Sequence, residues 1–323
     1  MRIRLCIAGL AMLAAAVGVC GQIKSPPETR NAALRYWMAF AEMKDPPSDQ
    51  ATQELLVRTA AGEATWDESK LGPILDANAD AIAMFQRATK LPDCDWGIEY
   101  SQGPRASIAY APRARVLARL NTIQGMREMA KGQSQAAVDT WLAGIRFTDH
   151  LAKGGSLIFA LIAESALLPN LRTLTLEAKQ RHLSSAQKQQ LYAAVNAVRE
   201  DGFDWGRAWQ IEAAGSEPFF AELRRSPDPA GTYAKVMGEP APKTCVPPEA
   251  REVQAFDEYM TDVAAALRLP PSQSKERIAA LEGKANNICE AIRRTIPRPQ
   301  HVNDARIEII TAREALLKAL QTN

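Results

Sequence analysis

Two serine–lysine pairs in the chain have the spacing that some acylating enzymes use. Ser185 stands three residues before Lys188, and Ser272 stands three residues before Lys275. In such enzymes the serine hydroxyl attacks a carbonyl carbon while a nearby base takes its proton. Both serines stand where a helix is expected to begin, and a hydroxyl there accepts a hydrogen bond from a free backbone N–H group. We therefore interpret both as helix caps, and the sequence has no GxSxG motif of a serine hydrolase.

The three histidines, His150, His182 and His301, are not spaced for metal binding or acid–base catalysis. No HExxH motif occurs, and no two histidines lie one helical turn apart. His150 and His182 fall near expected helix C-termini, where a protonated imidazole interacts favourably with the helix dipole. That structural role accounts for both residues without catalysis.

Acidic residues form one candidate cation site. Asp93, Asp95 and Glu99 lie close together in the segment 92–104, which we expect to be a loop. Hard cations such as Ca²⁺ take carboxylate ligands, but the spacing is not that of an EF-hand and the central glycine is missing. We expect the loop to be structural and to pack on the neighbouring helices.

Another acidic candidate lies beside two tryptophans. Trp205 and Trp209 share one face of an expected helix, and Asp204 and Glu212 are near them in sequence. Such a face can hold a sugar, and a pair of carboxylates can hydrolyse a glycosidic bond. Two tryptophans four residues apart are more often a buried helix–helix seam, and this is the interpretation that we prefer.

Composition and charge exclude several classes of partner. The chain is 46% apolar and 24% charged, as in globular proteins. Without its first 21 residues, which hold two arginines and no acid, it has 37 basic and 37 acidic residues. This balance is not that of a nucleic-acid-binding protein. The phosphate-binding motifs GxxxxGK[ST] and GxGxxG are also absent. We expect no nucleic-acid partner, no cofactor and no bound metal.

Three cysteines follow the N-terminal segment: Cys94, Cys245 and Cys289. They have no CxxC or Cys/His spacing, so a zinc site is not expected. An oxidising compartment would permit one disulfide and leave one thiol. Of the three pairings, Cys245–Cys289 closes the shortest loop and is preferred.

Residues 1–21 have the pattern of a signal peptide. Arg2 and Arg4 precede an uncharged apolar run over residues 5–19, and small residues follow. We expect export to the periplasm or the cell exterior. One alternative is a retained membrane anchor, although a bilayer span needs about 20 apolar residues. Another is a lipid on Cys20 that anchors the protein to the outer membrane, although Val19 departs from the small residue that normally precedes such a cysteine. Contact with a membrane is expected only in these two cases.

The remaining chain predicts an all-α fold, because helix-forming residues are frequent and alternating strand patterns are absent. In the first helix Leu34, Trp37, Met38 and Ala41 recur at helical spacing as an apolar stripe. We expect a helical body over residues 22–226, a Pro-rich linker over 227–248 and a C-terminal helical hairpin or bundle over 249–323. The expected helices cover residues 28–43, 48–58, 71–91, 105–130, 133–152, 156–181, 184–200, 205–224, 249–267, 272–295 and 302–320.

One helical hairpin, over residues 118–151, resembles a tetratricopeptide repeat. The resemblance rests on the spacing of Gly125, Gly132, Ala137, Trp141 and Gly144. It implies close antiparallel helices with a glycine turn and an indole in the seam, and a solenoid-like bundle of paired helices. No second copy lies 34 residues to either side, and an ordinary tight hairpin is the alternative.

The whole chain is also similar to a group of uncharacterised secreted, all-helical bacterial proteins. The similarity rests on the segment Asn-Ala-Ala-Leu-Arg-Tyr-Trp at 31–37, on Cys-Asp-Trp at 94–96 and on the helix at 305–320. It implies helical architecture and export, and it brings no catalytic residue with it.

These observations favour an exported, non-catalytic scaffold of the cell envelope that binds a protein or peptide in a helical groove. Trp96, Tyr100 and Arg113 are the residues expected on its binding face. The alternative is a helical-barrel hydrolase or lyase that acts on an envelope or extracellular polysaccharide. A third possibility, a purely structural outer-membrane lipoprotein, depends on a lipid at Cys20. A deep cleft lined by carboxylates and tryptophans would favour the enzyme, and a shallow groove would favour the scaffold.

Overall fold

The structure is a computed structural model that describes residues 28–180 and 182–321. The chain divides into two compact units, Met1–Arg30 and Asn31–Asn323. The expected signal peptide at residues 1–21, including Cys20, lies outside the described residues. The described part of the second unit is built from helices, with two isolated β-bridges and no strand. The all-α prediction is confirmed.

Short helices form the first part of this unit, and polar side chains cap three of them. The side chains of Asn31, Asp49 and Asp67 each accept a hydrogen bond from a backbone N–H group in the first turn that follows. The expected single helix over 71–91 is divided at Asn78, whose amide donates to the carbonyl of Ile74. The elements are α2 (Ala32–Glu42), α3 (Gln50–Ala60), α4 (Glu68–Ala77), α5 (Ala79–Ala88) and the 3₁₀ turn η2 (Tyr100–Arg105).

Helix α2 buries a different face from the one that its apolar stripe predicts. Leu34 and Met38 are each 54% exposed and Trp37 is 42% exposed, whereas Tyr36 and Phe40 are buried. The Tyr36 ring packs edge-on against Phe147 with the ring centres 4.8 Å apart, and stacks on Trp96. The large aromatic side chains therefore decide the orientation of α2, and the expected stripe is partly solvent-exposed.

The hairpin of α6 (Ala111–Ala130) and α7 (Ser134–Ala152) is closely packed where its small residues lie. A Cβ atom at Gly125 would overlap the Trp141 indole, which donates to the carbonyl of Thr122 at 3.1 Å. Gly132 has a φ of 73° in the turn, a value that glycine adopts without strain. Ala137 and Trp141 are fully buried, and Gly144 approaches Asn170. The small residues thus permit the close approach of the two helices.

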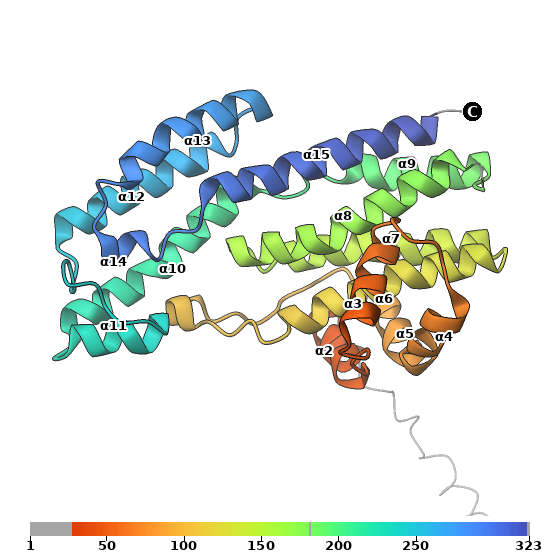
Figure 1. Cartoon of the computed structure of the whole chain (residues 1–323), viewed down its shortest axis with the longest axis horizontal. Helices are drawn as coiled ribbons and strands as arrows, with labels where there is room; N and C mark the ends of the chain where they lie inside the picture. Colours follow the sequence, from red (N-terminus) through yellow and green to blue (C-terminus); the bar gives the residue numbers. More distant parts are fainter. Residues whose placement is uncertain (1–27, 181, 322–323) are drawn as a thin grey trace, which may run out of the picture. The chain divides into compact units, whose positions relative to one another are not determined.

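Helix α8 (Leu157–Lys179) is the core helix of the unit. It is long and apolar enough to cross a membrane by length and composition, but 67% of its most apolar stretch is buried by other helices. Helices α7 and α15 (Pro299–Gln321) pack along it, and α9 (Ser185–Ala197) packs against α15 (Figure 1). We therefore describe α8 as a buried helix.

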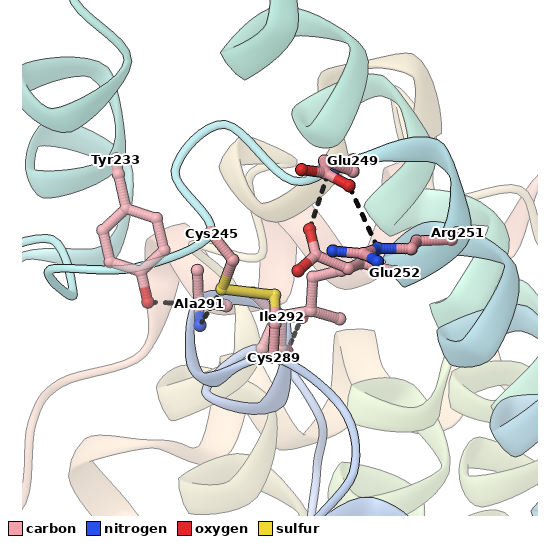
Figure 2. The surroundings of a disulfide bond; sticks show 9 residues. Tyr233, Cys245, Glu249, Arg251, Glu252, Cys289, Ala291 and Ile292 are labelled. Atoms are coloured by element: carbon pink, nitrogen blue, oxygen red, sulfur yellow. Dashed lines mark hydrogen bonds and ion pairs between the residues drawn. A yellow bond between two sulfur atoms is a disulfide. The ribbon is translucent and has the colours of Figure 1, made fainter.

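The remaining helices lie in the C-terminal part of the chain, where the disulfide Cys245–Cys289 joins the segment after α11 to the residue before α14 (Figure 2). The backbone N–H of Ala291 points to Cys245 Sγ at 3.5 Å, and the Tyr233 hydroxyl donates to the Ala291 carbonyl. The segment 227–248, expected to be a linker, contains α11. The elements are α10 (Trp205–Arg225), α11 (Pro229–Met237), α12 (Ala250–Ala266), α13 (Pro271–Ala285) and α14 (Glu290–Arg293).

A buried ion pair joins α15 to the body of the unit. Arg306, only 4% exposed, donates from Nε to Asp201 Oδ2 at 3.1 Å and from Nη2 to the Leu269 carbonyl at 2.7 Å. Asp201 lies just before α10, and Leu269 lies between α12 and α13. The end of the chain is therefore packed against the preceding helices.

Candidate functional site

A groove of about 760 Å³ lies beside α7 and is the candidate functional site. Its lining comes from the second half of α7, the residues that follow α5, the end of α9 and the start of α10. Four basic residues from these elements line it: Arg146, Lys153, Arg199 and Arg207. No tryptophan is among its lining residues in the described chain.

Two of these cations are unpaired. Arg146 on α7 and Arg207 on α10 line the groove, and neither guanidinium has a hydrogen-bond or ion-pair partner among the described residues. An unpaired guanidinium offers five N–H donors in a planar arrangement that matches a carboxylate. The groove can therefore bind an anionic group from two of its elements.

The acidic residues of the groove are already engaged. Asp149 lies 3.5 Å from the ammonium of Lys153, and Asp204 Oδ1 accepts the backbone N–H of Arg207 at 3.0 Å as the cap of α10. Arg199 pairs with Asp201 at 3.2 Å. Of these carboxylates Asp149 and Asp204 line the groove, and neither forms an ion pair with Arg146 or with the Arg207 guanidinium.

A second cavity, of about 450 Å³, extends the groove along α7. The two cavities share Thr89 and Arg146 in their linings. In the second, the Thr140 hydroxyl donates to Glu128 at 2.7 Å and accepts from the Gln86 amide at 3.1 Å. The two cavities therefore adjoin each other along α7.

His150 lies in the wall of the groove and is neutral. Burial, together with the nearby Lys153 cation, lowers its pKa to about 4, against the weaker opposing effect of Asp149. Its Nδ1 atom lies 2.8 Å from the Tyr36 hydroxyl, within hydrogen-bonding distance. The expectation that His150 stabilises a helix dipole as a cation is therefore wrong, because burial disfavours the charged form. His182, by contrast, lies 3.2 Å from Glu177 on the surface.

The three residues expected on the binding face do not line the groove. Trp96 is buried, its indole donates to the His150 carbonyl at 2.8 Å, and its ring stacks on Tyr110. Arg113 donates to the Phe40 carbonyl at 2.6 Å, at the C-terminal end of α2. Tyr100 lines a separate, smaller cavity. Trp96 and Arg113 have structural roles because their polar groups bind backbone carbonyls.

The other candidate residues are also separated by the fold. Trp205 and Trp209 are fully buried, so they do not form an exposed sugar-binding face. Asp204 lines the groove, whereas Glu212 lines the small cavity beside Tyr100. The buried-seam interpretation of the two tryptophans agrees with their burial.

Among the described residues, neither the two serine–lysine pairs nor the acidic loop forms a catalytic or metal-binding site. The cap of α9 is Ser184, which precedes Ser185, and α13 begins after Pro270 with Ser272 in its first turn. In the acidic loop, Asp95 Oδ1 accepts the backbone N–H of Gly97 at 2.9 Å. Among the described residues, the cluster close enough to hold a metal ion is Cys245, Glu252 and Cys289. Its two sulfur atoms form a disulfide and are not thiolate ligands.

Sequence analysis did not single out Arg146 or Arg207. A usable signal exists for α7, where Asp139, Arg146 and Lys153 recur at seven-residue steps and so share one face. Nothing in the sequence indicates that the start of α10 lies opposite this face, because more than fifty residues separate Arg146 from Arg207.

Comparison of the chain with protein-family models, curated proteins and solved structures finds no match.

Proposed function

We propose that the protein is an exported, non-catalytic helical scaffold of the cell envelope that binds an acidic segment of a protein or peptide. The binding surface is the groove along α7. The observation that carries the proposal is the pair of unpaired arginines, Arg146 and Arg207, on two different elements of that groove. Export rests on the apolar N-terminal segment of the sequence.

Two further observations support a peptide rather than a compact ligand. The second cavity lies next along α7, and there Lys90 has no ion-pair partner among the described residues, while Glu128 and Asp139 also line that cavity. Cations spaced along a groove suit an extended chain with several carboxylates, because each carboxylate can pair with a separate donor group. The lining without tryptophan is less suited to a sugar.

The test is charge reversal in the groove. The purified protein is used to capture partners from the native cell envelope after mild crosslinking, and the affinity of the captured partner is then measured. We expect the double substitution Arg146→Glu and Arg207→Glu to weaken binding at least tenfold. Binding by the wild-type protein should also weaken as salt increases, because exposed charge pairs are screened.

The matched control is Arg224→Glu in the last turn of α10. Arg224 is exposed, lies outside the groove and has no ion-pair partner among the described residues. Partner affinity unchanged by the double reversal, or reduced equally by Arg224→Glu, would reject the groove as the binding site.

A second candidate function is polysaccharide hydrolysis or cleavage, and it rests on Glu164. Burial and, to a lesser extent, the neighbouring Glu308 raise the pKa of the Glu164 carboxyl to about 7. A carboxyl that titrates near neutral pH suits a general acid, but Glu164 lines neither the groove nor the smaller cavities described above. The test is release of sugar fragments from envelope polysaccharide by the wild-type protein and its loss in Glu164→Gln. No release by the wild-type protein would reject this candidate.

A further inference from the structure

A smaller cavity of about 270 Å³ lies apart from the groove and holds a carboxyl group without a cationic partner. It lies between the loop that contains η2, the start of α8 and the middle of α10. Its walls are mainly apolar, and they include Ile98, Ile108, Ile158 and Ile211. The polar groups among its lining residues are few.

Glu212 is the charged residue of this cavity. Burial raises the pKa of its carboxyl, while hydrogen bonds from the Leu157 backbone N–H and from Ser156 oppose that effect. No cationic side chain contributes to the shift. Glu212 therefore binds the first N–H group of α8, and its negative charge has no counter-ion within the described residues.

One tyrosine lines the polar side of the cavity, and a second lies outside its lining. Tyr100 lines it beside Glu212, and the Glu212 charge contributes to raising the pKa of the Tyr100 phenol. Tyr110 is close enough to Tyr100 for the two phenols to interact. Tyr110 is only 1% exposed, and its hydroxyl has no hydrogen-bond partner among the described residues.

The loop that closes the cavity is held against α10. Arg105 pairs with Glu222 at 2.7 Å. Gly103, with a φ of 55°, approaches the carbonyl of Gly215 so closely that a Cβ atom would lie 2.6 Å from it. A Cβ atom on Gly215 itself would meet nothing within 4 Å. Gly215 therefore contacts Gly103 through its carbonyl, while the space where its own side chain would lie is open.

We propose that this cavity binds a small aromatic ammonium ion. The ammonium group would pair with the Glu212 carboxylate, and the ring would lie among the isoleucines and against Phe159. A cavity of about 150 Å³ with such walls holds benzene, so 270 Å³ has room for a ring with a one-carbon amine. The Tyr100 and Phe159 rings add favourable contact with a cation.

The experiment titrates the purified full-length protein with benzylammonium, benzyl alcohol and benzoate at neutral pH and follows binding by calorimetry. The three probes share a ring and differ in charge. We expect saturable one-site binding of benzylammonium, at least tenfold weaker binding of benzyl alcohol and no binding of benzoate. Equal binding of the alcohol, or no binding of benzylammonium, would overturn the proposal.

Two variants locate the site. Glu212→Gln keeps an oxygen to accept the α8 N–H group but removes the charge, so it should weaken benzylammonium binding at least tenfold while the protein stays folded. Gly215→Leu fills the open space and should abolish binding. Gly283→Leu on α13 is the control, since its Cβ atom also meets nothing within 4 Å. Unchanged binding in Glu212→Gln or Gly215→Leu would reject the site.

Discussion

At the scale of single residues, burial shifts two pKa values in opposite directions. It lowers the pKa of His150 and raises the pKa of Glu164. His150 is held neutral with a pKa of about 4, and the Glu164 carboxyl is held partly protonated with a pKa of about 7. In both cases loss of solvation is the largest cause, because a buried site disfavours the charged form of either group. Each residue therefore makes stability depend on pH, with opposite sign.

His150 should destabilise the fold in acid. Its pKa is about 4 in the folded chain and about 6.5 when unfolded, so between these values the unfolded chain binds a proton that the folded chain does not. The free energy of unfolding should fall by up to about 3 kcal/mol from this group as the pH drops from 7 to 4. His150→Asn should remove that part of the pH dependence. Urea unfolding at both pH values is the measurement, and an identical acid loss in the variant would contradict it.

Glu164 should destabilise the fold at alkaline pH. Its folded pKa is raised, so its contribution is full below the unfolded value of about 4.5 and is lost as the pH rises through about 7. We expect Glu164→Gln to be more stable than wild type near pH 8 by about 1 kcal/mol, after allowance for partial exposure. The advantage should disappear near pH 4. Glu308→Gln should lower the pKa of Glu164, which carboxyl NMR titration can measure.

At the scale of elements, close helix packing and helix propensity compete at the glycines within helices. In α6, Gly125 lies against the Trp141 indole, whereas in α10 the space around Gly215 is open. Both positions are helical, so the intrinsic gain from alanine is the same. The effect of an added methyl group on stability therefore depends on whether a neighbouring helix occupies the space beside the glycine.

Gly125→Ala and Gly215→Ala should therefore change stability in opposite directions. The added methyl group at Gly125 overlaps the indole and should cost about 1–3 kcal/mol. At Gly215 the same change should add up to about 1 kcal/mol through helix propensity. Thermal unfolding of the two variants is the measurement. A stabilising Gly125→Ala would show that the α6–α7 seam is looser than described.

At the scale of the whole unit, residues 31–323 form one compact body because α15 returns to pack along α8 and α9. Among the described residues, α15 pairs with that body through Arg306 and Glu308. Arg306–Asp201 is buried, whereas Arg172–Glu308 is exposed on the α8–α15 surface. Loss of one partner therefore costs more in the buried pair, although Asp201 also pairs with the exposed Arg199.

Arg306→Ala should lower the free energy of unfolding by about 1.5–3 kcal/mol, since Asp201 would keep only the exposed Arg199 and the Leu269 carbonyl would lose its charged donor. Arg172→Ala on the same interface is the matched control and should cost less than about 1 kcal/mol. Both values come from denaturant unfolding. Equal effects of the two substitutions would show that the Arg306 pair is not the main connection between α15 and the body.

Local physical chemistry made much of the fold predictable from the sequence. Frequent helix formers and the absence of alternating patterns predict the all-α class, which the structure confirms. Several helix boundaries follow from residues that act within one turn, such as the cap at Asp49 and the glycine turn at Gly132. Such signals are readable because they depend on neighbours in sequence.

Burial and site assembly depended on neighbours that are distant in sequence. The apolar stripe of α2 did not identify its buried face, because Tyr36 packs on residues more than a hundred positions away. The groove joins Arg146 to Arg207 across 61 residues, and the smaller cavity joins Tyr100 to Glu212 across 112. The sequence by itself thus determined the fold class and the local turns and caps. Only the tertiary structure decided which faces are buried and which charges meet, because burial and electrostatic pairing depend on distance in space.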